Sequence, residues 1–293
     1  MSGILLGPGG FLDQLRTGTS VNREETISEL LALAHPDYGL TGGVLLGCLG
    51  LLREGKLEVG ELGPHLPLIM DGWFSVYAEV VRLQRDGASA EWMFDEEYSG
   101  PRSDAEIVLD LFGYLPFERV GDALRKGLAL YDPRLKLFAS VSLLRQGKRV
   151  DRSELDRVAA SDEVRILLWE QLREIGFLSL IPAHWSSPAQ LAVSSLARWA
   201  SHPMELGVPP EGIELAQTYP VETDYGPLEA YLLRFRARSE PLAETRGWMA
   251  GIAGPFHDEK EVDSPWSFFD SWEAMSPEEH FKKMYYRGRS CES

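Results

Sequence analysis

Hydrophobic positions recur at helical spacing through the first two-thirds of the chain. In residues 21–34, Ile27, Leu30, Leu31 and Ala34 fall at i, i+3, i+4 and i+7, so they share one face of a predicted helix. Further segments have the same helical character, and short connections rich in Gly, Pro, Asp and Ser separate them. These predicted helices cover residues 41–53, 68–85, 104–112, 117–131, 133–146, 162–175 and 188–200.

Two of these helices resemble each other when they are aligned at an offset of 29 residues. The segments DPRLKLFASVSLLRQG (132–147) and SDEVRILLWEQLREIG (161–176) share their apolar positions and both end in glycine. A third segment, VLLGCLGLLREGK (44–56), has the LLRxG ending of the first. A lone helix pair cannot bury its apolar face, whereas stacked pairs can, and a terminal glycine permits a left-handed cap. We therefore expect stacked helical hairpins, with a non-repetitive helical bundle as the alternative.

The periodicity changes to that of strands after residues 202–203. Residues 213–221 and 231–237 alternate apolar and polar side chains, and 224–227 between them form a turn signal. The segment 248–256 is apolar on both faces and contains two glycines, which is typical of a covered strand or a close backbone approach. A final helix is predicted over 277–286. The sequence thus predicts a helical-repeat domain in residues 1–205 and a small antiparallel sheet with an acidic linker and a C-terminal helix in 206–293.

The helices with LLRxG endings resemble the helical hairpins of HEAT-repeat α-solenoids, over about residues 22–202. The run IELAQTYPVE…EAYLLRFRAR…GWMAGIAGPF is similar to a segment of bacterial HEAT-repeat-like proteins. The resemblance implies a mainly α fold, a HEAT-like α-solenoid with a small C-terminal antiparallel sheet and a terminal helix, that binds other proteins. Some bacterial members of this broad class are immunity or antitoxin-type proteins, and a few others are lyases for tetrapyrrole cofactors. The sequence contains no family active-site motif.

The chain is strongly acidic. Its 293 residues include 45 Asp and Glu against 29 Lys and Arg, a formal net charge of −16. Such a surface disfavours binding to nucleic acid or anionic membranes and permits a basic protein partner. Residues 1–100 have a net charge of −9, residues 101–206 are neutral and residues 207–293 have −7. We therefore expect a partner that recognises acids to contact the first or the last third.

Targeting signals and catalytic motifs are missing from the sequence. Residues 1–15 lack the basic start of a secretory signal, and neither 175–197 nor 40–52 has both the length and the apolarity of a membrane span. The two widely separated cysteines, Cys48 and Cys291, suggest reduced thiols and a cytoplasmic location. There is no complete P-loop, HExxH, CxxC pair or GxSxG motif. We therefore predict no catalytic, cofactor-binding or metal-binding residue, and a buried, inert thiol at Cys48.

Two segments that mix aromatic and acidic residues are candidates for partner binding. The first, 91–98, precedes a predicted break at Gly100–Pro101, and the second spans 258–272. Aromatic residues are frequent binding hot spots, and acids at the rim speed association with a cationic partner. The predicted contact residues are Trp92, Phe94, Asp95, Glu96, Glu97, Tyr98, Asp263, Trp266 and Asp270. In the alternative interpretation, the rings pack on the core and the acids are merely solvated.

A row of arginines marks one predicted strand. Arg234, Arg236 and Arg238 would point from one face, where they either hold an anion or pair with the nearby Glu222 and Glu229.

The function predicted from these observations is a non-catalytic, cytoplasmic protein-binding module. Its most concrete form is an immunity-type protein that neutralises a cognate toxin by occlusion through an acidic surface. One alternative is a helical-repeat enzyme or cofactor-handling lyase with a polar pocket. Another is a structural adaptor in a larger assembly.

Overall fold

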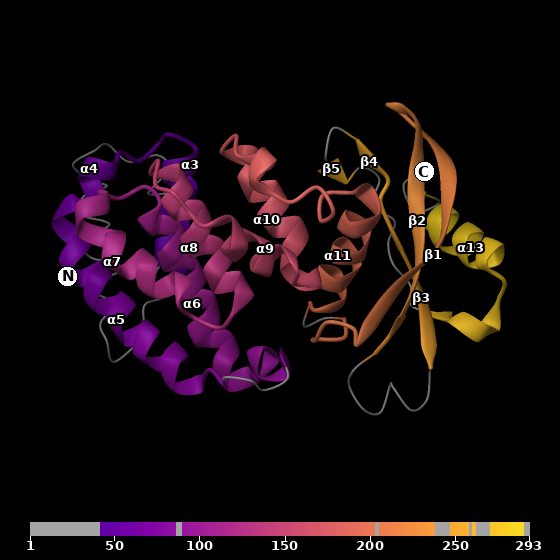
Figure 1. Cartoon of the computed structure of the whole chain (residues 1–293), viewed down its shortest axis with the longest axis horizontal. Coiled ribbons are helices and arrows are strands. Elements are labelled where there is room, and N and C mark those ends of the chain that lie inside the picture. The colour runs from indigo at the N-terminus through magenta and orange to yellow at the C-terminus, as the bar shows by residue number, and fades with distance from the viewer. Residues whose placement is uncertain are drawn as a thin grey trace, which may run out of the picture. The chain divides into compact units, whose positions relative to one another are not determined.

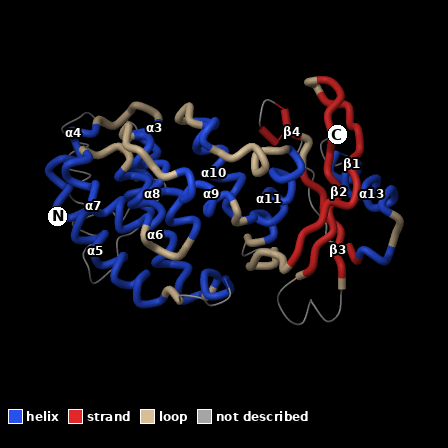
Figure 2. The backbone as a smooth tube through the Cα atoms, viewed as in Figure 1, coloured by secondary structure: helices blue, strands red, loops and turns tan. Residues whose placement is uncertain are grey.

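The computed structural model describes residues 42–85, 90–202, 205–237, 247–257, 260–261 and 270–289. The chain is mainly helical, with a small four-stranded antiparallel sheet and a C-terminal helix (Figures 1 and 2). It divides into two compact units, Met1–Asp151 and Arg152–Ser293. The change in composition near residue 205 therefore falls inside the second unit. The helix predicted over 21–34 lies outside the described residues.

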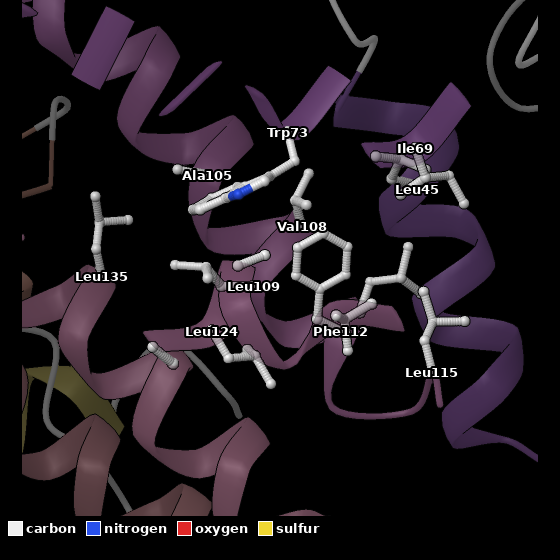
Figure 3. Packing of buried hydrophobic residues seen from close by; sticks show 14 of the residues in the cluster. Leu45, Ile69, Trp73, Ala105, Val108, Leu109, Phe112, Leu115, Leu124 and Leu135 are labelled. Atoms are coloured by element: carbon white, nitrogen blue, oxygen red, sulfur yellow. The ribbon is translucent and has the colours of Figure 1, made fainter. Parts of the chain in front are cut away.

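Helix α6 is the centre of the first unit, because it packs against α3, α5, α7 and α8. Its apolar residues meet those of its neighbours around Trp73 and Phe112, which are both fully buried (Figure 3). The two rings meet edge to face with 5.7 Å between their centroids, a favourable aromatic geometry. The helices of this unit are α3 (Gly42–Arg53), α4 (Val59–Leu62), α5 (Leu66–Leu83), α6 (Glu96–Phe112), α7 (Phe117–Leu128) and α8 (Pro133–Arg145), with single 3₁₀ turns η1 (Gly63–His65) and η2 (Ala90–Phe94).

The predicted break at Gly100–Pro101 is wrong, because α6 begins at Glu96 and continues through Pro101. Proline has no N–H to donate to the preceding turn, so it normally ends or kinks a helix. Here the first turns are held from outside the helix. Tyr98 is 1% exposed and its hydroxyl donates to Asp132 at the start of α8. Tertiary anchoring therefore overrides the local signal.

The glycine caps predicted from the sequence are confirmed at three helix ends. Gly55, Gly147 and Gly176 have φ of 65°, 70° and 77°, the left-handed region that glycine enters without a steric penalty. In each case the next residue donates its N–H to a carbonyl five residues earlier, the bond that defines a Schellman cap. The pairs are Lys56–Leu51 (2.8 Å), Lys148–Leu143 (2.9 Å) and Phe177–Leu172 (2.8 Å). The three helix ends thus have the same local structure, and the endings at Gly55 and Gly147 also share the LLRxG motif.

The second unit combines three helices, a sheet and a terminal helix. The helices are α9 (Arg152–Ala159), α10 (Asp162–Glu174), α11 (Pro188–Ala200) and α13 (Pro277–Arg289), with 3₁₀ turns η3 (Leu178–Leu180) and η4 (Trp272–Ala274). The strands are β1 (Gly212–Thr223), β2 (Gly226–Arg236), β3 (Trp248–Ala253) and β6 (Asp270–Ser271), in the antiparallel order β1-β2-β3-β6, and a separate two-residue pair β4 (Phe256–His257) and β5 (Lys260–Glu261). Among the described residues, β1 is thus an edge strand.

Helices cover the two faces of this sheet, with α11 on one side and α13 on the other (Figure 1). Strand β3 is consequently buried on both faces, as its sequence predicts. A Cβ atom on Gly251 would lie 2.8 Å from a methyl carbon of Leu196 in α11, so the predicted close approach at this glycine is confirmed. No helix within the described ranges is long and apolar enough to cross a membrane.

Candidate functional site

The rings of the first predicted contact segment are largely withdrawn from the surface. Trp92 is 5% exposed and Tyr98 1%, and the two rings pack edge to face with centroids 4.7 Å apart. Phe94 is half-buried beneath the guanidinium of Arg102, 5.3 Å from its ring centroid. In this conformation Trp92 and Tyr98 therefore stabilise the fold and offer little area to a partner.

The acids of that segment remain exposed, but two of the three are ion-paired. Glu97 accepts from Arg82 at 2.8 Å, and Asp95 lies 3.7 Å from Arg85. Glu96 is exposed in the first turn of α6, where a negative charge stabilises the helix dipole. The local field is therefore weaker than three adjacent acids suggest.

A buried ionic network anchors this segment to α8. Asp132 is fully buried and accepts from the Tyr98 hydroxyl at 3.1 Å, from Arg102 at 3.2 Å and from the backbone N–H of Arg134 at 2.8 Å. Glu106 lies 2.8 Å from the Arg134 guanidinium. Burial and the Asp132 carboxylate raise the pKa of Tyr98, so its hydroxyl stays protonated and can donate. Two arginines, Arg102 and Arg134, balance the charges of Asp132 and Glu106, which is the arrangement of a structural element.

A second buried carboxylate joins the LLRxG endings of α3 and α8. Asp110 in α6 is 2% exposed and forms ion pairs with Arg53 and, at 2.9 Å, with Arg145. The two arginines occupy the same position of the shared motif. The LLRxG motif that is repeated within this chain therefore stabilises the packing of α3 and α8 against α6.

Of the second predicted segment, Asp263 and Trp266 lie outside the described residues. Asp270 lies in β6, opposite Ala250 of β3, and its carboxylate is 2.7 Å from the ammonium of Lys283 in α13. This pair joins the sheet to the terminal helix.

The arginine row on β2 has a different partner from the one predicted. Arg234 pairs with Glu214 at 2.7 Å, because the strand register places these two residues opposite each other. Arg234 and Arg236 each lie 4.6 Å from the centroid of Trp248, a cation–π arrangement. The predicted pairing of Arg234 with Glu222 or Glu229 is therefore wrong, and Arg238 lies outside the described residues.

The turn end of the β1–β2 hairpin is acidic and exposed. Glu222, Asp224 and Glu229 are all exposed, and within the described part of the chain none of them forms an ion pair. Tyr225 in the turn is 59% exposed. Strand β3 pairs with β2 only over 231–236, so this end extends beyond the third strand. We call Glu222, Asp224, Tyr225 and Glu229 the acidic tip.

A groove of about 480 Å³ lies between β1 and α13. Five rings line it, and we call it the ring groove: Tyr219, Pro220, Pro277, Phe281 and Tyr286. The Tyr219 and Phe281 rings are stacked with centroids 4.1 Å apart, and Tyr286 meets Phe281 edge to face. Tyr286 is 56% exposed, so the groove is open at that side.

Polar groups border the ring groove. Gln217, Ser276, Glu278 and Lys282 line it, and the exposed pair Glu278–Lys282 is 2.7 Å apart. The Tyr219 hydroxyl is shielded from solvent and has no hydrogen-bond partner among the described residues. Burial and then the Glu278 carboxylate raise the pKa of Tyr219, so this group is a protonated donor.

Among the described residues, neither the acidic tip nor the ring groove has a cluster of side chains suited to covalent or metal chemistry. Cys48 is fully buried in α3, as predicted, and burial raises the pKa of its thiol to about 11. Within the described ranges, no three His, Cys, Asp or Glu side chains are grouped closely enough to hold a metal ion.

Sequence reasoning missed the ring groove, although its parts leave local signals. The Tyr-Pro pair lies within an alternating strand, and in the final helix Phe281 and Tyr285 are at i, i+4 spacing, with Tyr286 next to Tyr285. Only the tertiary fold brings these two segments together. No family model, curated protein or solved structure matches this chain.

Proposed function

We propose that this chain is a non-catalytic protein-binding module that holds a basic partner protein through the acidic tip. The observation that carries the proposal is the combination, on one projecting hairpin end, of three acids without ion pairs among the described residues and an exposed tyrosine. Tyrosine supplies a large, rigid contact area, while exposed acids accelerate encounter with a cationic surface.

The hairpin is well suited to hold these side chains in place. Strand β1 pairs with β2 along 212–223, and Val221 and Ala230 are buried against α13 near the turn. Side chains alternate between the two faces of a strand, so Glu222 and Glu229 lie on the face opposite α13. A rigid support of this kind reduces the conformational entropy that a contact residue loses on binding.

The most concrete form of the proposal is an immunity-type protein, whose acidic surface covers the basic active site of a cognate toxin. The proposal includes an α-solenoid of stacked helical hairpins as the helical scaffold. Its support is the packing of α8 against both α6 and α7 and the recurrence of one capped helix ending in three places.

The test is capture of a partner by the purified full-length chain at low salt, using as candidates the proteins encoded next to it. Two triple variants carry the same change in charge. Glu222→Gln/Asp224→Asn/Glu229→Gln neutralises the acidic tip, and Asp95→Asn/Glu96→Gln/Glu97→Gln neutralises the segment at the start of α6.

We expect the first variant to capture at least tenfold less partner protein and the second to capture as much as the parent chain. Loss with the second variant alone would move the binding surface to the α6 segment. Equal losses would show that only net charge matters, and capture of no protein would refute the binding function.

A further inference from the structure

We propose that the ring groove binds a proline-containing, extended segment of a protein, with a basic residue beside the prolines. This site is distinct from the acidic tip, because the two share no residue. The inference therefore goes beyond the proposed function.

The walls of the ring groove are rich in rings. Tyr219, Phe281 and Tyr286 line a space that two prolines also border. Grooves lined by aromatic rings recognise polyproline II segments, whose preformed extended shape loses little entropy on binding. The volume of about 480 Å³ lies within the range of ligand sites and exceeds that of one side chain.

The backbone of β1 is poorly suited to pairing with an added strand. Addition of a β-strand requires a row of N–H and C=O groups, but the strand side of the groove contains Pro220, which has no N–H to offer. The ladder of β1 also shifts register between Leu215 and Gln217, which interrupts a regular edge. A polyproline II segment needs no such row, because its own backbone makes no regular hydrogen bonds.

Tyr219 has an unsatisfied donor. The residue lines the groove, and its hydroxyl is shielded from solvent and has no acceptor among the described residues, which is costly for a buried donor. The carbonyl groups of a polyproline II segment project outward and remain available as acceptors. A bound segment would therefore complete the hydrogen bonding of Tyr219.

The acidic residues at the rim of the groove favour a ligand that has a basic residue next to its prolines. Glu278 lines the groove, and Glu279 follows it in the first turn of α13. Glu278 contacts Lys282 in an exposed i,i+4 pair, a type of contact that contributes little. An arginine of the ligand can replace Lys282 with two parallel hydrogen bonds to the carboxylate. A second copy of this chain fits less well, because β1 carries two acids, Glu214 and Glu222, and no base.

The experiment measures binding of a fluorescent peptide, several prolines followed by two arginines, to the full-length chain by anisotropy. A matched peptide keeps the arginines and replaces every proline by alanine. Tyr286→Ala removes an exposed groove ring, and Tyr219→Phe removes only the hydroxyl. Tyr131→Ala is the matched control, because it removes a tyrosine of similar exposure that lies in neither the groove nor the acidic tip.

We expect the proline peptide to bind at least tenfold more tightly than the alanine peptide. Tyr286→Ala should weaken its binding about tenfold and Tyr219→Phe about fivefold, whereas Tyr131→Ala should leave it unchanged. Equal binding of the two peptides, no binding of the proline peptide, or insensitivity to Tyr286→Ala would overturn the proposal. Self-association of the chain that Tyr286→Ala abolishes would assign the groove to a second copy instead. The partner-capture experiment with the acidic-tip variant is independent, so either proposal can fail alone.

Discussion

The segment 92–98 and the turn end of the β1–β2 hairpin have the same kinds of residues and opposite environments. Both combine aromatic rings with acids. In the first, Trp92 and Tyr98 are buried and two acids are paired with Arg82 and Arg85. In the second, Tyr225 is exposed and the acids form no ion pair among the described residues. Composition alone therefore does not distinguish a cluster that stabilises the fold from a surface available for recognition.

Removal of the buried acid beneath the first segment should have the largest effect on stability. Asp132→Ala should destabilise the chain by about 3–5 kcal/mol, because Arg102 and Tyr98 would lose their buried partner. Thermal unfolding followed by circular dichroism measures the loss. Asp224→Ala at the acidic tip is the control and should change stability by less than about 0.5 kcal/mol. Equal effects would mean that the two regions do not differ.

Truncation of one ring in each region gives the next contrast. Trp92→Ala should cost about 3–5 kcal/mol, since it leaves a cavity beside Tyr98. Tyr225→Ala should stay within about 0.5 kcal/mol of the parent chain, because its ring is mostly in water. Urea denaturation of both variants tests the pair. A stable Trp92→Ala variant would show that the segment is free to leave the core.

Removal of a single hydroxyl group should have a smaller effect than truncation of a whole ring. Tyr98→Phe should cost about 1–3 kcal/mol, because Asp132 loses one donor inside the protein. Tyr219→Phe should cost nothing or stabilise slightly, because its hydroxyl has no partner among the described residues. The same urea titration measures both. A loss of stability with Tyr219→Phe would reveal a hydrogen bond in the free protein and would remove one argument for the ring groove.

The smallest effects are expected from neutralising exposed acids. Glu97→Gln breaks an exposed contact with Arg82, and such pairs contribute little to stability. Glu222→Gln breaks no ion pair among the described residues and should leave the melting temperature unchanged. Differential scanning calorimetry at low and at physiological salt compares the two. A clear loss with Glu222→Gln would indicate a structural role for the acidic tip.

Local signals predicted much of the fold. Glycine caps depend on a few neighbouring residues, so Gly55, Gly147 and Gly176 ended their helices as expected. The strands β1 and β2 were visible in the alternation of their side chains. Helices α4 and α9 were missed because they are short, with 4 and 8 residues, and few apolar positions mark them.

The candidate sites were harder to predict, because their environment comes from distant parts of the chain. Burial of Tyr98 depends on Asp132 in another helix. The partner of Arg234 depends on strand register, which places Glu214 opposite it instead of Glu222. The ring groove forms only where α13 packs beside β1 in the folded chain. None of these relations is contained in a local window of sequence.

The bridge at Asp110 has a consequence for synthesis on the ribosome. Arg53 is made first, its carboxylate partner follows, and Arg145 completes the bridge only near the end of the first unit. Until then Asp110 lacks one of its two cationic partners. In a nascent chain that stops before α8, burial of this carboxylate therefore has a higher free-energy cost. The N-terminal unit should therefore acquire its final, protease-resistant form in one late step after Arg145 has emerged from the exit tunnel.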